Sequence, residues 1–135
     1  MNEITVEVET EVHQTEEEKK VRRAVENVFP NLSLSRIKGE GGVTILKGEA
    51  KGLESLENLR RLLKRERIRD AARGILLSSV QGEEITFHLN KQVAFSSRIS
   101  FCQPVSESPL GPISVKIKSK DSKKLIDWLA PSSSR

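Results

Sequence analysis

The sequence is poor in residues that carry covalent or redox chemistry, and it has no long apolar run. A single cysteine, Cys102, stands in 135 residues, so an internal disulfide is excluded and neither a zinc site nor a redox pair is indicated. The longest apolar stretches are short ones such as "GILL", far below the ~18 residues of a membrane span. The N-terminal "MNEITVEVETEV" lacks the basic and apolar regions of a signal peptide. We therefore expect a cytoplasmic domain without membrane contact.

Aromatic and catalytic side chains are also scarce. The chain has no tyrosine, one tryptophan and four phenylalanines, which leaves few side chains for stacking on nucleobases. Its two histidines, His13 and His88, are predicted at the end of a strand and on the polar face of another, with no nucleophile beside them in the sequence. "GEGG" and "KGEAKG" match neither the P-loop nor the dinucleotide fingerprint. We predict no catalytic residues, no cofactor and no enzymatic activity. The alternative, an enzyme acting on a small molecule, would require a deep pocket lined by His88 or Cys102.

Charge is abundant and unevenly distributed along the chain. Residues 1–59 contain 12 acids and 8 bases, a net charge of −4, whereas residues 60–135 contain 7 acids and 15 bases, a net charge of +8. A positive region of this kind can attract phosphate. Together with 36% hydrophobic residues, the length suffices for one core, and we predict a single domain over 1–130 with a polar tail at 131–135.

The N-terminal third predicts a strand and a helix. Residues 4–12 alternate apolar and polar side chains, which is typical of a strand with one buried face. Thr15 and Glu18 match a capping box, so a helix is expected from there to about Phe29, where Pro30 ends it. The polar face of the strand carries three carboxylates: Glu7, Glu9 and Glu11. These could bind a hard cation, but we interpret them as a solvated face and predict no metal.

The middle of the chain predicts a hairpin followed by two helices. Segments 32–40 and 43–51 alternate as strands do, and Gly41-Gly42 can form the tight turn between them. Residues 52–63 carry leucines at helical spacing. The apolar spacing then changes phase, which predicts a corner near Glu66 and a second helix beyond it.

The last third predicts mostly strands and ends in a helix. The expected elements are a strand at 84–90, a short connection at 90–95, a strand around 99–101, a proline-framed turn at 108–113, a strand at 113–119, and a short helix capped by Asp121 or Ser122. One helical turn within 90–95 is the alternative to an irregular connection there. This order predicts an α+β domain with a mainly antiparallel, about five-stranded sheet and helices packed on one face. That layout is similar to ribosomal proteins and to the RNA recognition motif.

Residues 59–73, "LRRLLKRERIRDAAR", hold seven positive and two negative side chains. They supply the candidate nucleic-acid contacts, which are Arg60, Arg61, Lys64, Arg65, Arg67 and Arg69, and the lysines within 116–124 are further candidates. The cluster also has an explanation without a ligand. Glu57 can pair with Arg61, and cations favour the last turn of a helix. Both interpretations stay open at this point.

Recognition of RNA on the sheet face is disfavoured. Bases would have to stack on exposed aromatic side chains. Phe87 and Phe101 share the apolar parity of their strands, and the three glutamates of 4–12 would repel a polyanion. Only phosphate contacts from the helices remain compatible with RNA.

The stretches "AVENVFPN", "GEAKGLESLENLRRLLKRERIRDAARGIL", "FHLNKQVAF" and "ESPLGPISVKI" together resemble a small archaeal family of uncharacterised proteins, classed as a domain of unknown function. The resemblance runs from the first strand to about Lys118. It implies an archaeal source and a five-stranded antiparallel sheet packed with helices, similar to the domain of the ribosomal protein that holds five-S ribosomal RNA. It implies no catalytic or binding residues.

Two functional hypotheses follow. The first is a non-enzymatic archaeal domain that acts through macromolecular contact, with self-association as a homodimer through Trp128 or a sheet edge beside "SPLGPI". The alternative is an RNA-binding protein that grips phosphates through the basic helical corner 60–73.

Overall fold

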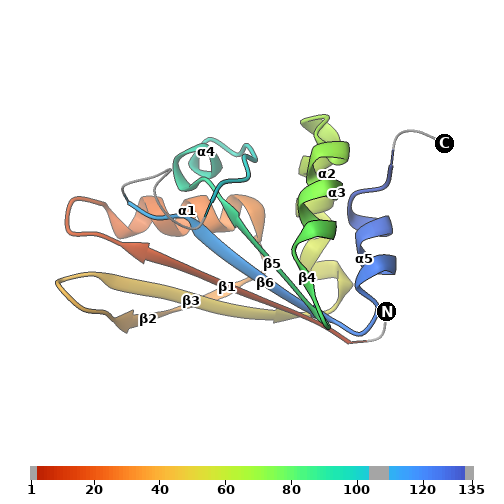
Figure 1. Ribbon diagram of the computed structural model, residues 1–135. Helices are drawn as coiled ribbons and strands as arrows, with labels where there is room; N and C mark the ends of the chain where they lie inside the picture. Colours follow the sequence, from red (N-terminus) through yellow and green to blue (C-terminus); the bar gives the residue numbers. More distant parts are fainter. Residues whose placement is uncertain (1–2, 104–109, 133–135) are drawn as a thin grey trace.

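A computed structural model describes residues 3–103 and 110–132. In this part of the chain, six antiparallel strands form one sheet in the order β2-β3-β1-β6-β5-β4, and the helices cover one of its faces (Figure 1). The strands are β1 (Ile4–Val12), β2 (Ser33–Lys38), β3 (Thr44–Lys51), β4 (Val80–Gln81), β5 (Glu84–Leu89) and β6 (Ile113–Ser119). The helices are α1 (Glu18–Val28), the 3₁₀ helix η1 (Leu53–Leu56), α2 (Glu57–Arg65), α3 (Arg69–Ser78), α4 (Lys91–Phe95) and α5 (Ser122–Leu129). The predicted fold class is confirmed.

The core lies between the helices and the sheet face that they cover. Strand alternation buries every second residue of β1, and Val6 and Val8 are at most 1% exposed. β6 follows the same rule with Ile113, Val115 and Ile117, which are fully buried. The opposite face, which we call the open face, carries the polar residues of the same strands and has no helix over it (Figure 1).

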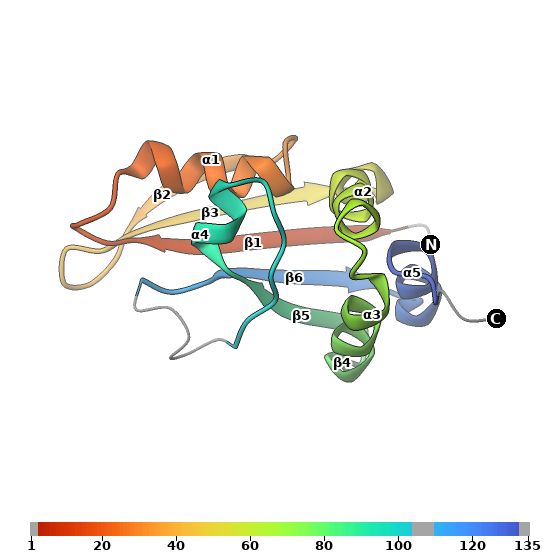
Figure 2. The same ribbon diagram turned by 90° about the horizontal axis from the view of Figure 1, so that it is seen from above.

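The helices form two groups along the strand direction. Seen from above, α1 and α4 lie over one end of the sheet, and α2, α3 and α5 lie at the other end (Figure 2). α1 buries Val21, Ala24, Val25 and Val28 and stops before Pro30, as predicted. Asp121 caps α5 by accepting a hydrogen bond from the Lys124 N–H at 3.0 Å.

Two local predictions at turns have clear outcomes. Gly41 and Gly42 adopt φ angles of 63° and 79°, which confirms the hairpin turn. The Thr15–Glu18 capping box is wrong, because α1 begins at Glu18 without a side-chain cap. Glu16 instead accepts a hydrogen bond from the His13 N–H at 2.9 Å.

The sheet differs from the prediction at its β4 side and near the prolines. The expected strand around 99–101 is reduced to one bridge, Leu89 to Phe101, whereas the two-residue β4 was not predicted. The expected helix 52–63 divides into η1 and α2. Pro109 of the predicted turn lies outside the described residues. β6 lies between β1 and β5, so the predicted free edge beside that turn is wrong.

Candidate nucleic-acid interface

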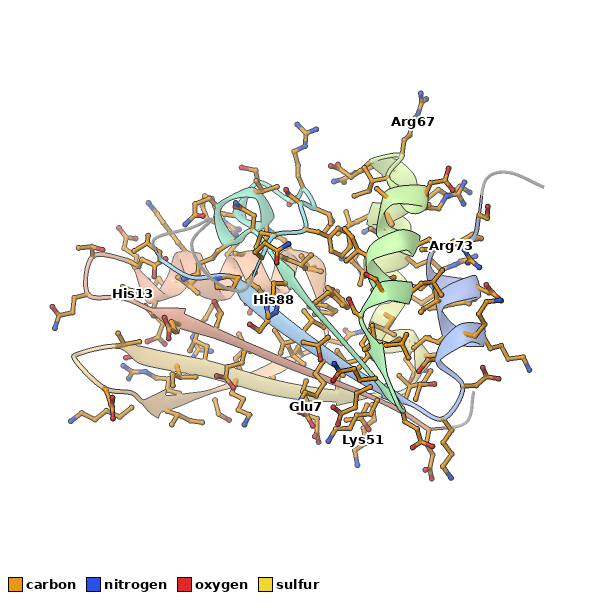
Figure 3. The ribbon with its side chains drawn as sticks, viewed as in Figure 1. Glu7, His13, Lys51, Arg67, Arg73 and His88 are labelled. Carbon is orange, nitrogen blue, oxygen red and sulfur yellow. The ribbon has the colours of Figure 1, made fainter. Side chains whose placement is uncertain are left out.

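The basic cluster lies at the corner between α2 and α3, as predicted. Leu59, Leu62 and Leu63 are buried beneath α2, so the cations between them point away from the core. α2 ends at Arg65, and Arg67 adopts a left-handed φ of 60° that turns the chain into α3. Figure 3 shows the Arg67 side chain at the tip of this corner, directed away from the sheet.

Four of the six predicted cations meet in one groove between α2, the start of α3 and Pro131, which lies two residues beyond α5. This groove of about 270 Å³, which we call the basic groove, is lined by Glu57, Arg60, Arg61, Lys64, Arg69 and Pro131. One carboxylate therefore faces four cations. Such an excess of positive charge within a concave surface focuses the electrostatic potential and attracts anions.

The cations of the basic groove differ in how firmly the protein holds them. Arg60 lies over the ring of Trp128, with its guanidinium carbon 5.0 Å from the ring centroid. Arg61 donates a hydrogen bond to the Asn58 side chain. Within residues 3–103 and 110–132, Lys64 and Arg69 form no ion pair, so their charges are available to a ligand.

Arg65 and Arg67 do not join the basic groove. Arg65 forms an ion pair with Glu66 at 3.2 Å and donates to the Ser97 carbonyl oxygen. Burial alone would raise the pKa of Glu66, but hydrogen bonds from Arg65 and Arg98 outweigh this effect, and the pKa is lowered. This side of the corner is thus partly neutralised by Glu66. The predicted pair of Glu57 with Arg61 is wrong, because Arg61 donates to Asn58 instead.

The open face carries as much charge as the corner, but the charges alternate. Its strands present five glutamates and four lysines, which are Glu7, Glu9, Glu11, Glu49 and Glu84 with Lys47, Lys51, Lys116 and Lys118. Lys118 lies 3.1 Å from Glu7, and Lys116 lies 4.0 Å from Glu84. Figure 3 shows Glu7 and Lys51 pointing away from the helices. The prediction of an acidic face is corrected to a face of mixed charge, because neighbouring strands supply lysines.

Two predictions concern this face. The absence of a stacking platform is confirmed, since Phe87 is 2% exposed and packs against Phe101 on the helix side, with ring centroids 5.6 Å apart. Lys116 and Lys118, two of the further candidate contacts within 116–124, lie on the open face, away from α2 and the basic groove.

His88 lies on the polar face of β5, as predicted. His88 Nδ1 lies 3.0 Å from the Ser114 hydroxyl of the neighbouring strand, and partial burial lowers the pKa of His88. A serine beside a histidine resembles part of a catalytic triad, which also needs a third group to orient the ring. Within the described residues, the other ring nitrogen of His88 has no hydrogen-bond partner. We interpret the contact as a cross-strand polar pair.

Sequence reasoning missed Lys91, a lysine that is only 3% exposed. Its ammonium donates to the carbonyl oxygens of Glu11 at 2.6 Å and Leu110 at 2.8 Å, and it lies 3.1 Å from a carboxylate oxygen of Glu16. Burial lowers its pKa, and Glu16 opposes that shift. Lys91 therefore joins β1, the start of α1 and the segment before β6. The sequence signal that lies nearest to Lys91 is Asn90, a residue type that favours helix caps and that caps α4 here.

In residues 3–103 and 110–132, no helix combines the length and the apolar character needed to cross a bilayer. This finding concerns helices only.

Comparison with known proteins identifies a family. A family model described as RNA binding matches residues 5–121. UPF0201 proteins of Aeropyrum pernix and Sulfurisphaera tokodaii are 43% and 45% identical to this chain, over 95% of it and over 85% and 88% of their own lengths. The crystal structure of a UPF0201 protein from Methanococcus jannaschii superimposes with a TM-score of 0.85 at 30% identity, covering 96% of this chain and 94% of that one. The chain thus belongs to the archaeal UPF0201 family of uncharacterised proteins, whose model bears the description RNA binding.

Proposed function

We propose that this protein is a cytoplasmic, non-enzymatic RNA-binding protein that contacts phosphates through the basic groove. The observation that carries the proposal is the convergence of four cations and one carboxylate on one concave surface. The description of the family model supports the same class of ligand. Phosphate contacts of this kind supply affinity without base specificity.

The placement of the site follows from charge. On the open face, Glu7 and Glu84 each lie within 4.0 Å of a lysine ammonium group, so a phosphate there would compete with carboxylates already in place. In the basic groove, Lys64 and Arg69 face a single acid, Glu57. A polyanion should therefore approach the helices and avoid the sheet.

The test is a titration with structured and single-stranded RNA at two salt concentrations, one of them about 50 mM. Affinity should fall with salt by about 0.7 to 0.9 log units per contacted phosphate for each tenfold rise in salt. The triple variant Arg61→Gln, Lys64→Gln, Arg69→Gln should lose most of this affinity and have a smaller salt slope, because it lacks three phosphate ligands.

A matched control removes three positive charges elsewhere. Lys19, Arg23 and Lys38 are exposed on α1 and β2, and their replacement by glutamine changes the net charge by the same amount. This control should keep the salt slope of the unaltered protein. Equal losses in the two triple variants, or no binding to RNA at about 50 mM salt, would overturn the proposed function.

A second candidate function is self-association through the edge strand β2. Five of its six residues are exposed, and Ile37 is 46% exposed. Among the described strands, β3 pairs with one edge of β2 and none pairs with the other edge. An unpaired edge of this kind can add a strand from a second copy. Trp128, the other predicted contact, lies under Arg60 and is half-buried. Light scattering should show a dimer that Ile37→Lys dissociates. A monomer at high concentration contradicts this candidate.

A further inference from the structure

Arg60 of α2 forms part of the wall of the basic groove and lies over the ring of Trp128 of α5. The guanidinium carbon lies 5.0 Å from the ring centroid, and the Arg60 Nε donates a hydrogen bond at 3.1 Å to the backbone oxygen of Trp128. The ring fixes the tilt of the guanidinium plane, and the hydrogen bond fixes its rotation. Arg60 lines the groove whereas Trp128 does not. The ring covers one face of the guanidinium, and the exposed Arg60 side chain has its other, outer face uncovered by Trp128.

Contacts between α3 and α5 hold the Arg60–Trp128 pair in place. Arg73 of α3 forms an ion pair with Asp127 of α5 at 2.7 Å and donates to the Ala130 carbonyl oxygen at 3.3 Å. The hydrogen bond from Arg73 is the main cause of the lowered pKa of Asp127. These contacts fix α5, and with it Trp128, against the helices that carry the groove cations. Figure 3 shows Arg73 between α3 and α5.

A flat guanidinium with one open face is a stacking surface for a nucleobase. Arginine planes stack on unpaired bases in RNA recognition, whereas the bases of a duplex are stacked on each other and do not offer their faces. Arg61, Lys64 and Arg69 line the same groove, where they can contact the phosphates on either side of a stacked base. A lysine in place of Arg60 would keep the charge but lose the plane.

We propose that the basic groove binds an unpaired nucleotide of single-stranded RNA, with its base stacked on the outer face of Arg60 and its phosphates on the other groove cations. This inference rests on the proposed function and specifies the form of RNA. It also assigns a stacking role to an arginine in a protein whose sheet lacks exposed aromatic residues.

The exposed ring of Phe95 offers a nucleobase a poorer stacking surface than Arg60 does. Phe95 is 41% exposed and lines a cavity of about 270 Å³ between α1 and α4. That cavity also contains Glu16 and Glu17, and Lys91 within it is already bound to Glu16. A phosphate beside a base on Phe95 would meet these carboxylates. Charge therefore favours Arg60.

The test compares ligands that share phosphates but differ in bases. The probes are an oligouridylate of about nine nucleotides, an abasic oligomer with the same number of phosphates, an RNA duplex and uridine monophosphate. Affinities are measured from the anisotropy of labelled probes, with the unlabelled monophosphate measured by competition. The oligouridylate should bind about fivefold or more tightly than the abasic oligomer. Trp128 is the only tryptophan of the chain, so its emission should change with the oligouridylate and stay constant with the duplex.

Two variants separate stacking from charge and from folding. Arg60→Lys keeps the charge but loses the plane, so it should bind the oligouridylate and the abasic oligomer with equal affinity. Trp128→Phe keeps a ring beneath Arg60 and should retain the preference for bases. An unchanged preference in Arg60→Lys, or equal affinity for duplex and single strand, would overturn this inference and leave the proposed function intact. Uridine monophosphate binding as tightly as the oligomer would overturn the assignment to a strand. If no probe binds, both proposals fail.

Discussion

The basic groove and the open face are both rich in charge, yet they differ in how the charges are arranged. On the open face, the pleat of adjacent strands places lysines beside glutamates, as for Lys118 and Glu7 at 3.1 Å. At the helical corner, Lys64 and Arg69 share a groove with one carboxylate, Glu57. The number of cations therefore says little about binding. What distinguishes the two regions is the number of carboxylates beside the cations, which is five for four lysines on the open face and one for four cations in the basic groove.

The largest expected effect concerns Lys91, the cation with the most complete set of partners. Lys91→Met leaves Glu16 buried without its partner, so the free energy of unfolding should fall by about 3 kcal/mol or more. Urea denaturation measures this loss, and the exposed Lys20→Met serves as the control. The folded fraction of Lys91→Met should keep its RNA affinity. A loss below about 1 kcal/mol would place Lys91 with the surface pairs.

The next effect would convert the open face into a basic one. The variant Glu7→Gln, Glu9→Gln, Glu11→Gln leaves two glutamates beside four lysines there. Added to the triple variant of the groove, it should restore salt-dependent RNA binding, with a gain of about tenfold at low salt. A melting curve checks that the fold survives. No gain in affinity would mean that net charge alone does not explain the difference between the two regions.

A smaller effect is expected from removing the one acid of the basic groove. Glu57→Gln should raise RNA affinity about two- to fivefold, because it removes a repulsion worth up to about 1 kcal/mol. Glu54→Gln is the matched control, since Glu54 belongs to η1 and does not line the groove. Equal gains in both variants would indicate a general effect of net charge.

The smallest expected effect is on the free energy of unfolding of variants at the two charged surfaces. Glu7→Gln breaks a pair whose side chains are 28% and 47% exposed, and it should lower the free energy of unfolding by at most about 1 kcal/mol. Lys64→Gln should leave that free energy unchanged or raise it by a few tenths of a kcal/mol, since it relieves repulsion among like charges. Chemical denaturation compares the two. A larger loss for Lys64→Gln would show that Lys64 has a structural role.

The sequence predicted the fold class because strand and helix periodicities are local. The alternation in 4–12, the change of phase near Glu66 and the turn at Gly41-Gly42 all depend on near neighbours. The capping box at Thr15 and Glu18 was a local failure, whereas the failures in the sheet involve short or distant segments. β4 has two residues, too few to show a period, and the segment around Phe101 meets β5 through one bridge only.

The candidate site was predicted in part. Helical spacing places Arg60, Arg61 and Lys64 outside the leucine stripe of α2, but it does not predict that Arg69 of α3 joins them while Arg65 and Arg67 face elsewhere. Pairing of Arg60 with Trp128 joins residues 68 positions apart, and a helical wheel of one segment cannot reveal it. The positions of the β6 lysines could not be predicted for the same reason, because their partners lie on β1 and β5.

The strand order has a consequence for how the chain acquires its structure. β6 pairs with β1 from the Ile4–Ser119 pair to the Thr10–Ile113 pair, and it lies between β1 and β5. The centre of the sheet is therefore assembled from the first and last of the described strands. Contacts over such sequence separations slow folding, and a nascent chain that stops before β6 exposes the edges of both β1 and β5. During translation, the protein should stay dependent on protection from aggregation until β6 has left the ribosome.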